Sequence, residues 1–194
     1  CRQLCNVCGC VVVNVGYRLA PEDPYPACME DGYTVLQWVH DNGALRGMDP
    51  ARIALAGDSA GANISAVVSL LARDRLGPEI GLQVLCYGCY GCLADQDSAS
   101  MQAFSKGGYV LSREFLDLIP KLYVQDRTGP EDPYLNPGCA ADLTKLPRTY
   151  VITAEYDPLR DDGEAFAGRL REAGNDVTLE RVPGMMHGFL RLWE

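Results

Sequence analysis

IALAGDSAGANIS, at residues 53–65, is the stretch that decides the fold. The apolar run Arg52–Ala56 is typical of a strand buried on both faces, and Ala60–Arg75, rich in Ala, Val and Leu, predicts a helix. Between them stands the motif GDSAG at residues 57–61, with Ser59 at its centre. A serine flanked by glycines at a strand-to-helix junction matches the pattern G-x-S-x-G, the nucleophile elbow.

The two glycines of this motif have a steric explanation. An elbow holds its serine in a strained backbone conformation, so that the hydroxyl of Ser59 projects from the sheet. A side chain at Gly57 or Gly61 is expected to collide where the strand and the helix pack closely. The alternative is a glycine-rich connector, in which Ser59 is only the small polar residue of a tight turn.

Strands and helices alternate along the rest of the chain. Strands are predicted at Cys10–Val15, Arg52–Ala56, Leu82–Tyr87, Thr149–Ala154 and, towards an edge, Val177–Val182. Helices are predicted at Ala27–Asp41, Ala60–Arg75 and Asp162–Ala173. A further helix is predicted to begin at a Ser112 cap and to run through Tyr123, with a kink at Pro120. This order predicts an α/β fold with an open, mostly parallel sheet and flanking helices, whose functional loops follow the carboxyl ends of the strands.

A serine nucleophile needs a general base and a carboxylate that orients it. The chain has two histidines. His40 falls within a predicted helix and is expected at the surface or the core edge, whereas His187 lies in the loop 183–189 that directly follows the last predicted strand. Asp157 directly follows the strand before it, with Glu155 as the alternative acid. The order Ser59, Asp157, His187 is the one found in α/β-hydrolases.

Four stretches, spread over nearly the whole chain, resemble the hormone-sensitive-lipase-like branch of the α/β-hydrolases. They are YRLAPE at residues 17–22, GDSAG at 57–61 with Asn63, DPLRD at 157–161, and HGF at 187–189. The resemblance implies an α/β-hydrolase fold that cleaves carboxylic esters, usually with short acyl chains, through an acyl-enzyme and without a metal or other cofactor. It implies Ser59 as nucleophile, His187 as base and Asp157 as orienting acid, and it places the backbone N–H of Ala60 in the oxyanion hole.

The sequence also departs from the family pattern. Gly16 stands where members usually have Asp, Ala62 stands where they have Gly, and YGCYGCL at residues 87–93 lacks the usual Pro-containing turn. The family's His-Gly-Gly-Gly loop, which supplies further oxyanion donors, does not occur in these 194 residues. We therefore expect a sequence truncated at both ends, without the N-terminal cap and without a central strand between Cys10–Val15 and Arg52–Ala56. A gap in the sheet, or direct pairing of those two strands, should result. The chain as given should have little activity.

Length and charge bound the remaining possibilities. The 194 residues fit one domain, with 17 basic and 26 acidic side chains and a net charge of −9. This acidity argues against a nucleic-acid partner, because phosphates are bound by clustered Lys and Arg. No run of eighteen apolar residues predicts a membrane span, and no signal peptide is seen, so a cytoplasmic location is expected. The expected partner is a small ester, and the oligomeric state stays open.

Nine cysteines are many for a chain of this length. They stand at positions 1, 5, 8, 10, 28, 86, 89, 92 and 139. The spacings Cys5-x2-Cys8 and Cys86-x2-Cys89-x2-Cys92 could indicate a metal site or disulfides. The alternative, which we favour, is that they are small packing residues in a reducing compartment, since an odd count does not complete a disulfide framework. No metal site is predicted.

Three rival functions remain open. One is an amidase or peptidase of the same fold. Another is a binder of a small ligand without catalysis, as in relatives such as the gibberellin receptor of plants, which lack the triad histidine; the presence of His187 argues against it. The third is a thiol–metal protein that uses the two cysteine clusters.

Overall fold

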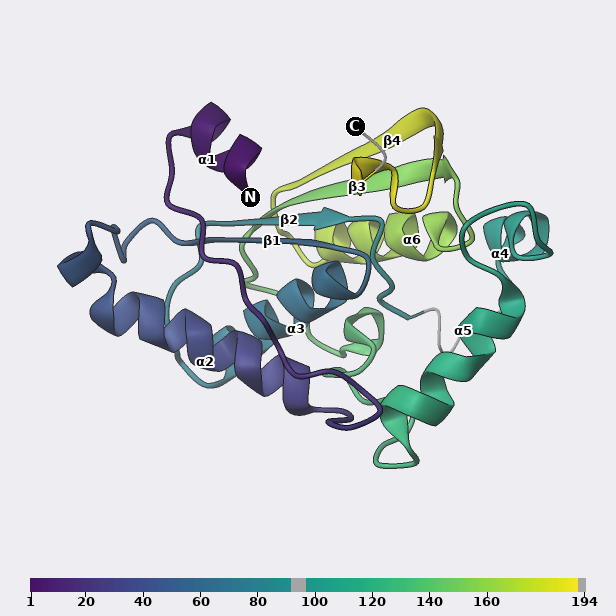
Figure 1. Cartoon of the computed structure of the whole chain (residues 1–194), viewed down its shortest axis with the longest axis horizontal. Coiled ribbons are helices and arrows are strands. Elements are labelled where there is room, and N and C mark those ends of the chain that lie inside the picture. The colour runs from purple at the N-terminus through teal and green to yellow at the C-terminus, as the bar shows by residue number, and fades with distance from the viewer. Residues whose placement is uncertain (92–96, 192–194) are drawn as a thin grey trace.

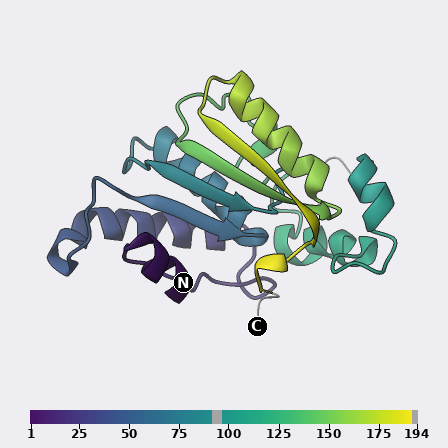
Figure 2. The same cartoon turned by 90° about the horizontal axis from the view of Figure 1, so that it is seen from above.

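The computed structural model describes residues 1–91 and 97–191. Its sheet has four strands in the order β1-β2-β3-β4, and each neighbouring pair is parallel. The strands are β1 (Ala54–Asp58), β2 (Leu82–Cys86), β3 (Arg148–Tyr156) and β4 (Val177–Met186). Four of the five predicted strands are therefore confirmed, the last of them at an edge. All four carboxyl ends lie at one side of the sheet (Figure 2).

The helices also follow the predicted order. They are α1 (Arg2–Cys8), α2 (Ala27–Asn42), α3 (Ala60–Asp74), α4 (Ala99–Phe104), α5 (Arg113–Ile119) and α6 (Arg160–Glu172). The Ser112 cap is confirmed, since its hydroxyl accepts the N–H of Phe115 at 3.2 Å. At Pro120 the α-helix ends and a π-helical turn, η2 (Pro120–Val124), continues it. The short α4 was not predicted.

The core lies between the sheet and the helices α2, α3 and α6, which cover the same face of the sheet (Figure 1). Two clusters of buried side chains make it up. The first joins Met29, Tyr33 and Leu36 of α2 to Val67, Val68 and Leu71 of α3. The second joins Leu85 and Val151 of the sheet to Ala66 and Leu70 of α3 and to Phe166 and Leu170 of α6. This packing fixes where α3 begins and therefore where the serine turn stands.

The prediction of a strand at Cys10–Val15 is wrong. The segment after α1 is extended but has no strand neighbour, and it runs past the sheet to the start of α2 (Figure 1). Val11 and Val13 are 59% and 42% exposed. An extended segment becomes a strand only when another backbone pairs with its N–H and C=O groups, so apolar content alone does not decide. The two predicted strands do not pair directly, and β1 is an edge strand of the described part of the chain.

The position of β1 at the edge of the sheet also explains why none of its residues is buried. Burial on both faces was expected for this strand, but no residue of Ala54–Asp58 is buried. By contrast, Leu85 in β2 and Val151 in β3 lie between neighbouring strands and are almost fully buried. Within the described residues, no helix combines the length and the apolar character needed to cross a membrane.

Candidate active site

Ser59 stands at the junction of β1 and α3, as predicted from the sequence. Its backbone has φ 54° and ψ −121°, a conformation with positive φ that non-glycine residues rarely adopt. A Cβ added to Gly57 would lie 2.1 Å from the carbonyl oxygen of Gly61, so only glycine fits there. The same steric expectation for Gly61 is wrong, because a Cβ added there meets nothing within 4 Å. The close approach is made by the backbone of Gly61, against the Cα of Gly57.

Ser59, His187 and Asp157 form one hydrogen-bonded chain. The Nε2 of His187 lies 2.9 Å from the hydroxyl of Ser59, and its Nδ1 lies 2.8 Å from Oδ2 of Asp157. The second oxygen of Asp157 accepts the backbone N–H of Leu159 at 2.9 Å. Asp157 is fully buried and His187 is 5% exposed. Both carboxylate oxygens are thus occupied, so the acid is held in one orientation against the imidazole.

The parallel sheet explains how residues far apart in sequence meet. Ser59 follows β1, Asp157 follows β3 and His187 follows β4, so all three stand at the same edge of the sheet (Figure 2). Ligand and catalytic sites of open parallel sheets form at this edge. Ser59 and His187, which are 128 residues apart in the sequence, are therefore joined directly by a hydrogen bond.

The two other candidates from the sequence take different places. Glu155, the alternative acid, accepts the backbone N–H of Gly184 at 2.7 Å and so supports the β4 backbone ahead of His187. His40 lies on α2 with a side chain that is 49% exposed, and its Nδ1 lies 2.9 Å from Asp41. The imidazole beside Ser59 is that of His187, and the carboxylate beside His187 is that of Asp157.

Ala60 is the first residue of α3. The N–H groups in the first turn of a helix have no acceptor within the helix, and the N-terminal end of the helix carries partial positive charge. Because Ala60 directly follows Ser59, its N–H can donate to an anion that forms beside the serine hydroxyl.

Aromatic rings that support the imidazole were not predicted from the sequence. Tyr87 follows β2, is 2% exposed and has a positive φ of 39°. Its ring lies 5.0 Å from that of His187, and the ring of Phe189 lies 5.4 Å from Tyr87. Burial raises the pKa of the Tyr87 phenol, so the group stays a neutral donor and donates to Asp58 at 3.3 Å. The sequence feature that could have indicated a role for Phe189 is the HGF stretch at residues 187–189.

The cysteines differ in burial and in bonding. Cys86 ends β2 in the buried cluster of Tyr87 and Phe189, and burial raises the pKa of its thiol to about 11. It is a packing residue, as expected. Packing is the wrong interpretation for Cys1, Cys5, Cys8 and Cys10, which are exposed in and around α1. Cys89 is disulfide-bonded, so the expectation of reduced packing cysteines is wrong for it too, and Cys92 lies outside the described residues. No group of three His, Cys, Asp or Glu side chains able to hold a metal occurs in the part of the chain that the structure describes.

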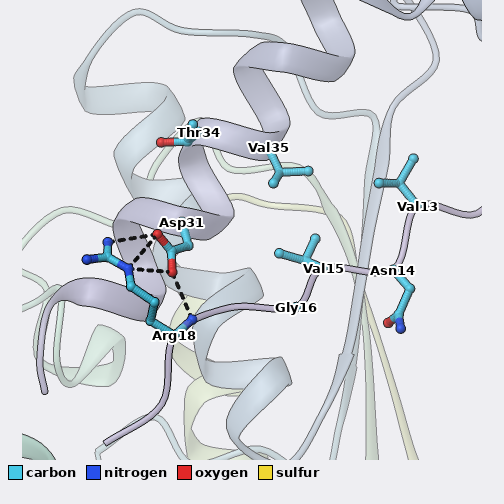
Figure 3. Close-up of a pocket in the computed structure, with 8 residues that line it drawn as sticks. All are labelled: Val13, Asn14, Val15, Gly16, Arg18, Asp31, Thr34 and Val35. Atoms are coloured by element: carbon cyan, nitrogen blue, oxygen red, sulfur yellow. Dashed lines mark hydrogen bonds and ion pairs between the residues drawn. The ribbon is translucent and has the colours of Figure 1, made fainter. Parts of the chain in front are cut away.

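An open pocket of about 440 Å³ lies between the segment 13–18 and helix α2 (Figure 3). Arg18 and Asp31 line it and pair with each other, with Nη2 of Arg18 2.8 Å from Oδ1 of Asp31. Neither Ser59 nor His187 lines this pocket. It is therefore separate from the hydrogen-bonded chain of the candidate site.

Comparison with known proteins places these observations in a family. The sequence family described as alpha/beta hydrolase fold matches residues 1–191. The carboxylesterase NlhH of Mycobacterium tuberculosis is 45% identical over 187 residues, covering 93% of this chain and 56% of that protein. An arylesterase of Saccharolobus solfataricus is 40% identical over 192 residues, covering 97% of this chain and 61% of its own length.

The fold is similar to that of solved esterases. The hyperthermophilic esterase of Pyrobaculum calidifontis superposes with a TM-score of 0.91 at 42% identity, covering 98% of this chain and 62% of that one. The chain thus spans 56% and 61% of the length of the two relatives named above.

Proposed function

We propose that this chain, which belongs to the hormone-sensitive-lipase-like branch of the α/β-hydrolase family, carries the nucleophile, base and acid of a carboxylesterase. The observation that carries the proposal is the unbroken hydrogen-bonded chain from Ser59 through His187 to Asp157. Its relatives named as a carboxylesterase and an arylesterase support ester hydrolysis as the reaction class. We further propose that residues 1–194 belong to one catalytic domain.

The geometry supports a two-step acyl transfer. In the first step His187 takes the proton of the Ser59 hydroxyl at Nε2 while the serine oxygen attacks the ester carbonyl. Asp157 holds the Nδ1–H of the imidazole and stabilises the imidazolium that forms. The N–H of Ala60 donates to the oxyanion of the tetrahedral intermediate. His187 then returns the proton to the leaving alkoxide, which departs as an alcohol and leaves an acyl-serine.

The second step repeats the first with water in place of the serine. His187 accepts a proton from the water as its oxygen attacks the acyl-serine carbonyl. Collapse of the second tetrahedral intermediate breaks the bond to Ser59, and His187 returns the proton to the serine oxygen. The products are an alcohol and a carboxylic acid. We propose short-chain acyl esters as the substrate class, following the family resemblance.

We propose that these 194 residues alone hydrolyse esters slowly. Ala60 is the only oxyanion donor that the resemblance assigns within them. Each missing donor of this kind lowers kcat by about 10²–10³-fold. The base and the acid retain their geometry, so slow but serine-dependent turnover is expected rather than none.

The test compares the wild type with Ser59→Ala on p-nitrophenyl acetate, p-nitrophenyl hexanoate and a matching p-nitroanilide. We expect Ser59-dependent release of p-nitrophenol, faster from the acetate than from the hexanoate, and none of p-nitroaniline. A p-nitrophenyl phosphonate should modify Ser59 in the wild type, as intact mass would show. Turnover and labelling that are equal in the wild type and Ser59→Ala would overturn the proposal, and preference for the anilide would indicate an amidase.

A further inference from the structure

We propose that Asp58 is a positioning residue for the base, and that its carboxylate ties the His187 loop to the serine turn. The inference rests on the proposed function, since it gives a role in the reaction to the residue that precedes Ser59. The only function that the sequence suggests for Asp58 is to fill the variable position of the motif G-x-S-x-G.

One oxygen of Asp58 joins three loops at the carboxyl edge of the sheet. Asp58 is the last residue of β1, and its Oδ2 accepts from Nε of Arg191 at 2.9 Å. The same oxygen accepts from the phenol of Tyr87, directly after β2, at 3.3 Å. Arg191 ends η4 (Phe189–Arg191), the 3₁₀ turn that follows His187. Residues at the ends of β1 and β2 and in the turn that follows β4 thus meet on a single atom.

Two sets of contacts connect Oδ2 of Asp58 to the imidazole of His187. Through Tyr87, the bonded phenol fixes a ring whose centroid lies 5.0 Å from His187, with the planes at 61°. Through Arg191, the ion pair holds η4, whose Phe189 packs against the same Tyr87 ring at 5.4 Å. Asp157 holds one end of His187, and these contacts restrict the tilt of its ring. The tilt decides whether Nε2 stays aimed at the Ser59 hydroxyl.

The contact is suited to positioning more than to stability. The Asp58 side chain is 33% exposed and that of Arg191 is 75% exposed. Ion pairs between such exposed groups contribute little to folding stability. Catalytic rates, however, are sensitive to small displacements of reacting groups, and Asp58 is bonded directly to the nucleophile residue in the backbone. Loss of the contact should therefore lower kcat clearly and leave the melting temperature nearly unchanged.

The experiment is a double-mutant cycle of Asp58→Asn and Arg191→Gln, with kcat, KM and Tm measured on p-nitrophenyl acetate. Asp58→Asn keeps the side-chain shape but replaces the ion pair with Arg191 by a weaker hydrogen bond to a neutral amide, and Arg191 is exposed enough for Arg191→Gln to fold. Each single variant should lower kcat about tenfold with KM nearly unchanged, and the double variant should be no slower than the singles. The matched control is Arg52→Gln, which removes an exposed Arg–Asp pair (2.6 Å to Asp49) next to the other end of β1 and should leave kcat unchanged.

Several outcomes would overturn the inference. If the pair acted only through its charges, Asp58→Asn and Arg191→Gln would change the rate in opposite directions. Effects that multiply in the double variant would mean that the residues act independently, and an effect on Tm or KM alone would indicate a structural role. Unaffected variants of an enzyme whose turnover depends on Ser59 would remove the inference but keep the proposed function. A wild type without Ser59-dependent turnover would remove both.

Discussion

Gly57 and Gly61 approach so closely that a Cβ on Gly57 would lie 2.1 Å from the Gly61 carbonyl oxygen, whereas a Cβ on Gly61 meets nothing within 4 Å. The two glycines of the motif are therefore not equivalent. Gly57 is required by the approach of strand to helix, while Gly61 only supplies the backbone that is approached.

This asymmetry predicts opposite effects on stability. Gly57→Ala forces the β1–α3 junction apart and should lower the free energy of unfolding by about 3 kcal/mol or more. Gly61→Ala, at the second residue of α3, should be neutral or stabilising by up to about 1 kcal/mol. Urea unfolding followed by circular dichroism measures both. Equal losses in the two variants would contradict the steric account.

A second prediction separates the two carboxylates near the base. Asp157→Asn replaces the acceptor of the His187 Nδ1–H and should lower kcat by about 10⁴-fold, because the imidazole is then held in the wrong tautomer. Glu155→Gln keeps an oxygen that can accept the Gly184 N–H and should change kcat by less than about tenfold. Turnover of p-nitrophenyl acetate is the measurement. A larger loss in Glu155→Gln than in Asp157→Asn would reverse the assignment.

Those parts of the site that depend on the order of the strands could be predicted from the sequence. Ser59, Asp157 and His187 each follow a predicted strand, and parallel strands bring such positions to one edge whatever the details of packing. The chain order then left a single histidine at that edge. Hydrogen bonds of 2.8 and 2.9 Å are consistent with this reasoning, although side-chain distances could not be predicted from the pattern.

Features that depend on contacts with distant parts of the chain could not be predicted from the sequence. Cys10–Val15 has the composition of a strand, but pairing with another backbone decides whether a strand forms, and none pairs with it in the described chain. Tyr87 adopts a positive φ of 39° that no local pattern indicates, and its ring is placed by contacts with His187 and Phe189. The burial of Gln83 within an apolar strand also needed its hydrogen-bond partners to be known.

Gln83 is fully buried in β2 and bridges two hydroxyls, accepting from Ser69 at 2.9 Å and donating to Thr149 at 2.8 Å. The Ser69 hydroxyl has a second acceptor, the backbone carbonyl of Ser65 at 3.0 Å, and the Thr149 hydroxyl already donates to the backbone carbonyl of Pro147 at 2.9 Å. Gln83→Leu should therefore lower the free energy of unfolding by no more than about 1 kcal/mol, since the Ser69 hydroxyl can donate to Ser65 instead and the Thr149 hydroxyl keeps its bond to Pro147.

Gln83→Ala is the matched comparison. It removes the same amide but also leaves a cavity, so it should lower the free energy of unfolding by about 2–3 kcal/mol. Urea unfolding of the two variants gives the difference. Equal losses would mean that the amide hydrogen bonds, and not the filled volume, dominate the role of Gln83.

The last prediction concerns the anchor of the extended N-terminal segment. Arg18 donates from its side chain and its backbone N–H to Asp31 on α2, with contacts of 2.8–3.1 Å. The hydrogen bonds from Arg18 hold the pKa of the Asp31 carboxyl below its usual value. A carboxyl whose pKa is lowered by folding stabilises the fold above its unfolded pKa, about 4, and loses that contribution as the pH falls through the folded pKa.

Asp31→Asn should therefore lower Tm most above about pH 5, and the difference from wild type should shrink steadily below about pH 4. Thermal unfolding from neutral pH into the acid range measures it. Asp176→Asn, which breaks a pair with Arg148 whose side chains are 68% and 65% exposed, is the control and should change Tm little at any pH. A Tm difference for Asp31→Asn that stays constant down to about pH 2 would contradict this account, because the carboxylate would then not be the group that holds the segment.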